Sequence, residues 1–222
     1  MNKVLIVSKS NFFKKKITNR KFFFIQNKKY LNIQYLKKKN PSIIFFPHWS
    51  YKVSESITCK YLCIGFHATP LPYGRGGTPI QNMILKGYSK TKLCALKLEK
   101  SYDSGAIYKI ISVSLNGSGS EIFNRLYLNI LKIIKSLSLK LPNPKKQTGK
   151  PTYFKRRKPN QSKIKKILNL NELYNFIRML DIDEKNFPKA NLKFGNFKYE
   201  FSNTKKIGNI LKANVVIKNI NR

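Results

Sequence analysis

The side chains best suited to proton chemistry in this sequence are one histidine and one aspartate. His67 ends the apolar run Tyr61–Phe66, which has the length of a buried strand. Histidine titrates near neutral pH and can donate or accept a proton, although a lone histidine after such a run is more often structural. Asp103 lies in the polar stretch Ser101–Gly105. A carboxylate beside an imidazole orients it and favours its charged form, so we expect these two side chains to meet.

The elements that must position this pair are a buried strand and a hairpin. Buried parallel strands carry their chemistry at their carboxyl ends, where a loop can hold polar groups. His67 is followed there by a loop that contains three prolines and three glycines. The apolar runs Leu93–Leu98 and Ala106–Val113 flank Asp103 and predict a hairpin with the carboxylate in its turn.

A helix is expected directly after the glycines of this loop, over residues 78–87. Thr78 is the predicted N-cap, Pro79 suits the first helical position, and Gly87 ends the segment. The backbone N–H groups at such a start can receive an anionic group.

Short apolar runs alternating with helical patterns predict an α/β fold, with a Rossmann-like, mostly parallel sheet flanked by helices. No glycine-rich dinucleotide fingerprint follows the first predicted strand, so the sequence does not indicate a bound dinucleotide. We expect Ile33–Leu36 to continue the second strand region. Besides Tyr61–Phe66, the predicted strands of this part are Lys3–Val7, Phe22–Ile25 and Ser42–Phe46.

Two regions follow from composition. Residues 1–148 are expected to form the main domain, and residues 149–222 a small β-rich C-terminal appendage. Leu141–Pro151 is rich in proline, lysine and asparagine, which is typical of a linker. The appendage contains a predicted helix at Asn171–Leu180 and apolar runs at Asn191–Phe194, Phe197–Phe201 and Ala213–Ile217.

The chain carries a formal net charge of +36, from 38 lysines and seven arginines against nine acidic residues. Clustered basic residues indicate nucleic acid. These lysines are spread over the whole chain, however, and arginine is the better reader of phosphate. The charge therefore leaves open a role in binding RNA, in steering a smaller anionic substrate, or neither.

The three cysteines, Cys59, Cys63 and Cys94, form no even disulfide framework, and their spacing lacks a second pair for zinc. We expect reduced, buried thiols and no metal. No apolar run has the length of a membrane-spanning helix, and the short apolar segment after Met1 is unlike a signal peptide. The expected location is the cytoplasm.

Several of these motifs together resemble the signature of the folate-dependent formyltransferase family. They are His67 with the Pro-Leu-Pro that follows, the run Arg75–Gln81, and the Asp-Ser-Gly that begins at Asp103. The family includes methionyl-tRNA formyltransferase and nucleotide-sugar N-formyltransferases. Its site uses an Asn-x-His pair at a strand end and an aspartate in an Asp-x-Gly turn. His67 and Asp103 match this pattern, whereas Gly65 stands in place of the asparagine. The N-terminal part is shortened relative to the family.

The resemblance implies formyl transfer from formyl-tetrahydrofolate to an amine, without a metal. His67 would stabilise the oxyanion and handle protons, and Asp103 would orient His67 or accept the proton of the amine. Either a backbone N–H at Gly65 or Ala68 replaces the missing asparagine or the enzyme is slow or inactive, and we expect the replacement because His67 and Asp103 are both retained. The residues expected to bind the folate donor are Gly65, Pro72, Arg75, Gly76 and Gly77.

The amino-acid sequence of the loop after His67 predicts that the acceptor is the amine of a nucleotide-linked amino sugar. The same loop resembles sugar-modifying relatives, and residues 150–222 are short for the C-terminal domain expected of the tRNA enzyme. Methionyl-tRNA is the alternative acceptor, and it suits the positive charge. A non-catalytic relative that binds folate or an anionic partner is a third reading, motivated by Gly65.

Overall fold

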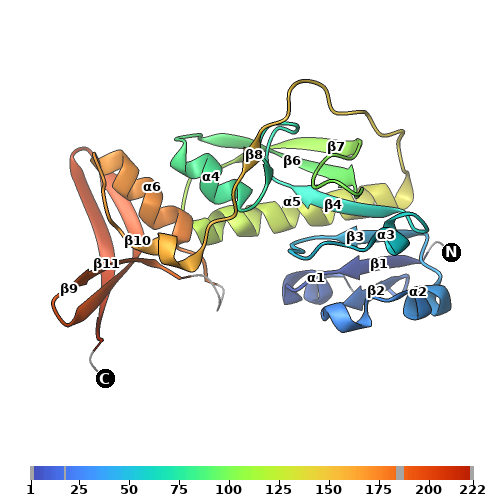
Figure 1. Ribbon diagram of the computed structural model, residues 1–222, viewed down its shortest axis with the longest axis horizontal. Helices are drawn as coiled ribbons and strands as arrows, with labels where there is room; N and C mark the ends of the chain where they lie inside the picture. Colours follow the sequence, from blue (N-terminus) through green and yellow to red (C-terminus); the bar gives the residue numbers. More distant parts are fainter. Residues whose placement is uncertain (1–2, 18, 184–187, 221–222) are drawn as a thin grey trace. The chain divides into compact units, whose positions relative to one another are not determined.

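The computed structural model describes residues 3–17, 19–183 and 188–220. Its main sheet has six strands within this part of the chain (Figure 1). In order across the sheet they are β2 (Phe22–Ile25), β1 (Val4–Val7), β3 (Ile43–Phe46), β4 (Cys63–His67), β6 (Lys90–Lys97) and β7 (Ile107–Ser114). The first four strands pair in parallel, and β4 pairs antiparallel with β6. The predicted α/β, Rossmann-like architecture is confirmed.

Helices alternate with these strands and continue into the C-terminal part of the chain. They are α1 (Asn11–Lys16), α2 (Ile33–Lys39), α3 (Glu55–Thr58), α4 (Pro79–Leu85), α5 (Gly119–Leu139) and α6 (Leu170–Leu180), with the 3-10 helices η1 (Lys28–Tyr30) and η2 (Pro159–Ser162). The expected continuation of a strand at Ile33–Leu36 is wrong, because these residues begin α2. The side chain of Asn32 accepts a hydrogen bond from the Tyr35 N–H at 2.9 Å and so starts a helix.

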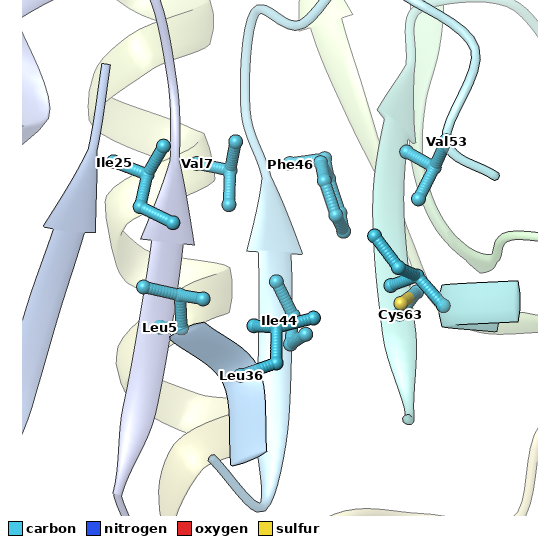
Figure 2. Packing of buried hydrophobic residues seen from close by; sticks show 9 residues of the cluster. Leu5, Val7, Ile25, Leu36, Ile44, Phe46, Val53 and Cys63 are labelled. Atoms are coloured by element: carbon cyan, nitrogen blue, oxygen red, sulfur yellow. The ribbon is translucent and has the colours of Figure 1, made fainter. Parts of the chain in front are cut away.

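On one face of the parallel strands, buried apolar side chains pack into a cluster. Leu5 and Val7 of β1 lie on the same side as Ile44 and Phe46 of β3, because alternate residues of a strand share a face (Figure 2). Leu36 of α2 packs against them. This core fixes β3 and β4 side by side, and β4 carries the predicted site histidine at its carboxyl end.

The long helix α5 begins at a reciprocal capping box formed by Ser118 and Glu121. The Glu121 N–H donates to Ser118 Oγ at 3.2 Å, and the Ser118 N–H donates to Glu121 Oε2 at 2.7 Å. Further along, Tyr127 packs against Phe12 and Phe13 of α1, with ring centroids 5.3 Å apart in each pair.

The described chain divides into two compact units, of which the first holds most of the main sheet. The first is Met1–Gly76 with Lys92–Ser112 and Leu126–Tyr153, and the second is Gly77–Thr91 with Val113–Arg125 and Phe154–Arg222. The second unit contains an antiparallel sheet of β9 (Ala190–Phe194), β10 (Phe197–Ile207) and β11 (Ile210–Asn219), which confirms the predicted β-rich C-terminal part. Its helix α6 contacts both α4 and β10. A domain boundary at residue 148 stays a prediction.

Two short strands, β5 (Arg75–Gly76) and β8 (Tyr153–Phe154), form a separate two-stranded sheet. Helix α4 begins where expected, but Thr78 does not cap it with its side chain. Thr78 Oγ1 instead accepts a hydrogen bond from the Arg157 N–H at 3.1 Å. The same oxygen accepts from Asn82 Nδ2 of α4 at 3.2 Å, and the φ of Thr78 is +45°, unlike the extended backbone of a usual N-cap.

Replacing Ile44 with alanine tests the core. Ile44 is fully buried in β3, so Ile44→Ala should lower the free energy of unfolding by about 2–5 kcal/mol. Ile110→Ala is the matched control, because Ile110 lies in β7 with half of its surface exposed and should cost less than about 1 kcal/mol. Urea unfolding measures both changes. Equal losses would show that the core is not centred on β1, β3 and β4.

Candidate active site

His67 is the last residue of β4 and one of the few buried polar side chains, with 5% of its surface exposed. It lies in register with Cys94 of β6, so the imidazole stands at the edge where β4 gives way to its loop. Its Nε2 lies 2.8 Å from the carbonyl oxygen of Gly74. A carbonyl can only accept, so Nε2 carries a hydrogen and donates it. This bond fixes the ring and leaves Nδ1 as the nitrogen that can exchange a proton.

Asp103 meets that nitrogen. Its Oδ2 lies 3.4 Å from His67 Nδ1, and the same oxygen accepts a hydrogen bond from the Gly76 N–H at 2.9 Å. Asp103 lies between β6 and β7 with a φ of +52°, a conformation that aspartate adopts more readily than most residues. About a fifth of its side chain is exposed. The structure therefore brings together the two residues selected from the sequence.

The loop after His67 is held by Thr152. The Gly74 N–H donates to Thr152 Oγ1 at 2.8 Å, and the Arg75 N–H donates to the Thr152 carbonyl at 2.9 Å. In return, the Thr152 N–H donates to the carbonyl of Pro72 at 3.2 Å. Gly74 and Gly76 have φ values of +68° and +101°, which glycine adopts without strain. The Gly74 carbonyl that orients His67 is thus itself positioned by a distant segment.

Gln147 is a site neighbour that sequence reasoning missed. Its Oε1 accepts hydrogen bonds from Arg75 Nε at 3.2 Å and Nη2 at 2.7 Å. Its Nε2 donates to the carbonyls of Asp103 and Gly105 at 2.8 and 2.9 Å. Gln147 stands in the segment predicted as a linker, and a single glutamine there carries no pattern that marks it as part of a site.

The other predicted donor-binding residues lie in two settings. Pro72, Arg75 and Gly76 are half-buried in the loop beside His67. Gly77 is buried, and a Cβ on it would lie 2.4 Å from the Cβ of Arg156. The close approach of the chain at Arg156 is enough to require glycine at this position.

Gly65 lies two residues before His67 in β4, and alternate residues of a strand share a face. It is paired by register with Phe46 on one side and Leu96 on the other. A Cβ at residue 65 would lie 2.5 Å from Cδ2 of Leu98. The end of the Leu98 side chain therefore fills the space beside Gly65, and a larger residue such as the family's asparagine would require Leu98 to shift.

The two buried thiols near the site are poor nucleophiles. Burial raises the pKa of Cys63 to about 12 and that of Cys94 to about 11. Cys94 Sγ also donates to the Thr69 carbonyl at 3.3 Å. Cys59 is exposed, so the expectation that all three cysteines are buried is wrong. It follows Thr58, the last residue of the short helix α3.

Within the described residues, no cluster of three histidine, cysteine or acidic side chains could hold a metal ion. In the same part of the chain, no helix combines the length and the apolar character needed to cross a membrane.

Solved structures and curated relatives identify the family. The structure titled "Methionyl-tRNA formyltransferase from Clostridium thermocellum" is 36% identical to this chain, with a TM-score of 0.90, and the match covers 99% of this chain and all of that one. Because such a relative is matched over its whole length, the chain belongs to the folate-dependent formyltransferase family.

Within that family, the sequence matches point to one branch. The methionyl-tRNA formyltransferase of Sulfurihydrogenibium sp. (strain YO3AOP1) is 32% identical over 174 residues, which are 73% of this chain and 54% of the relative. The chain thus spans about half the length of the curated relatives it matches. A sequence model described as "Methionyl-tRNA formyltransferase, C-terminal domain" matches residues 159–218.

These comparisons overturn the amino-sugar acceptor expected from the sequence. A sugar N-formyltransferase from Shewanella sp. FDAARGOS_354 is only 15% identical, with a TM-score of 0.68 over 93% of this chain and 99% of that one, a level that shows the fold alone. The short C-terminal region does not argue against the tRNA branch either, because the Clostridium thermocellum chain is matched in full. The loop misled because it adjoins His67, one of the residues by which the sequence resembles the whole family, so it does not distinguish one branch from the other.

The thiol environments predict a clear order of alkylation. At pH 8, a thiol with a pKa near 12 is ionised in only about one molecule in ten thousand, so Cys63 and Cys94 should resist iodoacetamide in the folded protein. Exposed Cys59 should react first. Mass spectrometry after timed labelling measures this order, and labelling in guanidinium chloride, where all three should react, is the control. Fast labelling of Cys94 in the native protein would contradict the described burial.

Proposed function

We propose that this chain transfers a formyl group from formyl-tetrahydrofolate to the amino group of methionyl-tRNA. The observation that carries the proposal is the contact of His67 with Asp103 at the end of β4, in a chain matched throughout by a methionyl-tRNA formyltransferase structure. The proposal replaces the sugar acceptor.

The chemistry requires a neutral amine, a stabilised oxyanion and a fixed approach of the two reactants. When bound, formyl-tetrahydrofolate supplies the electrophilic formyl carbon. A carbon–nitrogen bond forms to the amine as the bond from the formyl carbon to the folate nitrogen breaks. The amine loses a proton, and the folate nitrogen gains one.

The described residues suit these needs. His67 is held through Nε2, so Nδ1 is the nitrogen left to take up and pass on a proton, and once protonated it would stabilise negative charge on the formyl oxygen. The carboxylate of Asp103, 3.4 Å from that nitrogen, accepts the proton of the amine or holds the imidazole in place. Formyl transfer to an amine needs a proton donor beside a proton acceptor. The pairing of His67 with Asp103 therefore supports formyl-tetrahydrofolate as the source of the formyl group.

Donor binding is proposed for Gly65, Pro72, Arg75, Gly76 and Gly77, as the family resemblance implies. Pro72, Arg75 and Gly76 follow His67 on the loop whose Gly74 carbonyl orients the imidazole, which supports their assignment. The missing asparagine motivates one competing proposal, a binding protein without activity. The retained contact between His67 and Asp103 favours an enzyme.

The tRNA partner is supported by charge. Exposed lysines lie along the three-stranded sheet of the second unit, and this sheet lies within the segment matched to the family's C-terminal domain. Lysines on such a surface release counterions from a phosphate backbone, so binding should weaken steeply with salt. These lysines are Lys193, Lys205, Lys206, Lys212 and Lys218.

The same proposal includes the division of the chain and its location. Residues 1–148 would form the catalytic domain, and residues 149–222 the C-terminal subdomain that contacts tRNA, a division that the match at residues 159–218 supports. A cytoplasmic location is proposed because aminoacyl-tRNAs are made and used there.

An acceptor panel tests the proposed function. The purified chain is incubated with formyl-tetrahydrofolate and either methionyl-tRNA or a set of nucleotide-linked amino sugars. We expect formylated methionyl-tRNA, and a loss of at least about 100-fold in kcat for His67→Ala with unchanged circular dichroism. His48→Asn is the matched control, because His48 is the other histidine of the chain and its ring packs against Tyr127.

Formylation of an amino sugar but not of methionyl-tRNA would contradict the proposed acceptor. Folate binding without turnover of any acceptor would contradict an enzyme and support the binding protein. Full activity of His67→Ala would remove the imidazole from the reaction.

A further inference from the structure

The segment between α5 and β8 contacts both the turn that carries Asp103 and the loop that follows His67. Its Lys145 exchanges two backbone hydrogen bonds with Ile107, the first residue of β7, at 2.8 and 2.9 Å. Seven residues on, Thr152 holds the loop at Pro72, Gly74 and Arg75. We call residues 145–152 the strap. All of the strap belongs to the first compact unit, as do His67 and Asp103.

Gln147 is the strap residue that contacts both the loop after His67 and the turn that carries Asp103. Through Oε1 it holds the guanidinium of Arg75, and through Nε2 it holds the carbonyls of Asp103 and Gly105. The amide uses its oxygen for two donors and both of its hydrogens for two acceptors. Turning the amide over would set an oxygen against two carbonyls and an NH₂ against a guanidinium. The contacts therefore specify glutamine and its orientation.

These contacts bear directly on the imidazole and its partner. The backbone of Asp103 is anchored by Gln147, while its carboxylate is anchored by the N–H of Gly76, the residue next to Arg75. Asp103 also has a positive φ, which costs free energy and persists only where neighbours hold it. Gln147 supplies such a restraint and ties the turn to the loop that orients His67.

We infer that Gln147 is a positioning residue for His67 and Asp103, acting by locking the turn around Asp103 to the loop at Gly74–Gly76. Glutamine at this position touches neither nitrogen of the imidazole. Its effect passes through the backbone of Asp103 and through Arg75. The effect on turnover rests on the proposed function, whereas the effect on the geometry of His67 does not.

Two substitutions separate the contacts of Gln147. Gln147→Ala removes all four hydrogen bonds. Gln147→Glu keeps an acceptor for Arg75 but loses the two donors to the carbonyls of Asp103 and Gly105. Gln26→Ala is the matched control, because Gln26 is an exposed glutamine of the same unit whose amide bonds to Asn11.

The decisive readout is the state of the imidazole nitrogens, recorded by long-range proton–nitrogen NMR of the full chain without ligand. The chain has two histidines, so His48 is an internal reference. In both Gln147 variants we expect the nitrogen signals of His67 to shift while those of His48 stay. In turnover, Gln147→Glu should lower kcat by about 10- to 100-fold and change KM for formyl-tetrahydrofolate by less than about threefold.

Thermal melting accompanies both measurements. If Gln147→Ala does not fold, Gln147→Glu, which keeps the contact to Arg75, decides the question. Unshifted His67 signals in a folded Gln147 variant would overturn the inference, whatever happens to kcat. If the wild-type chain formylates nothing, the proposed function fails, and the NMR comparison still tests whether Gln147 positions His67.

Discussion

The candidate site depends on one constraint: both nitrogens of a buried imidazole face oxygen atoms that are fixed by other segments. Gly74 offers a carbonyl to Nε2 of His67, and Asp103 sets a carboxylate 3.4 Å from Nδ1. Neither oxygen is held by its own segment alone, since Thr152 restrains Gly74 and the Gly76 N–H restrains Asp103. One nitrogen of this imidazole is thus held by a carbonyl, and the other, which faces a carboxylate, is the one proposed to exchange a proton.

The sheet provides the rigid side of this arrangement. β4 is paired with β3 as far as Gly65 and with β6 as far as His67, so the strand cannot shift without disturbing both pairings. The segments that complete the site are loops and turns, which carry the polar groups that a buried strand cannot. Leu98 fills the space beside Gly65, while the contact of His67 with Asp103 is kept.

Much of this arrangement is predictable from the sequence, for identifiable reasons. The apolar run before His67 and the paired runs around Asp103 have strand lengths and polar ends, so the pattern of residues alone places both side chains at strand ends. The apolar character of Ile33–Leu36 suits a strand equally well, and only the cap at Asn32 decides for a helix. The roles of Gln147 and Thr152 leave no trace in the sequence, because they exist only once the strap has folded back onto the loop. The acceptor could not be predicted from the loop after His67, because residues beside a motif that the whole family shares do not distinguish a sugar acceptor from a tRNA acceptor.

The most direct test of the account is whether His67 and Asp103 act as one unit. Rates of formyl transfer to methionyl-tRNA would be compared for His67→Ala, Asp103→Ala and the double variant. If the two side chains act as one catalytic unit, formyl transfer by the double variant should be no more than about threefold slower than by the slower single variant. Losses that multiply in the double variant would show two independent contributions and contradict the central role of their contact.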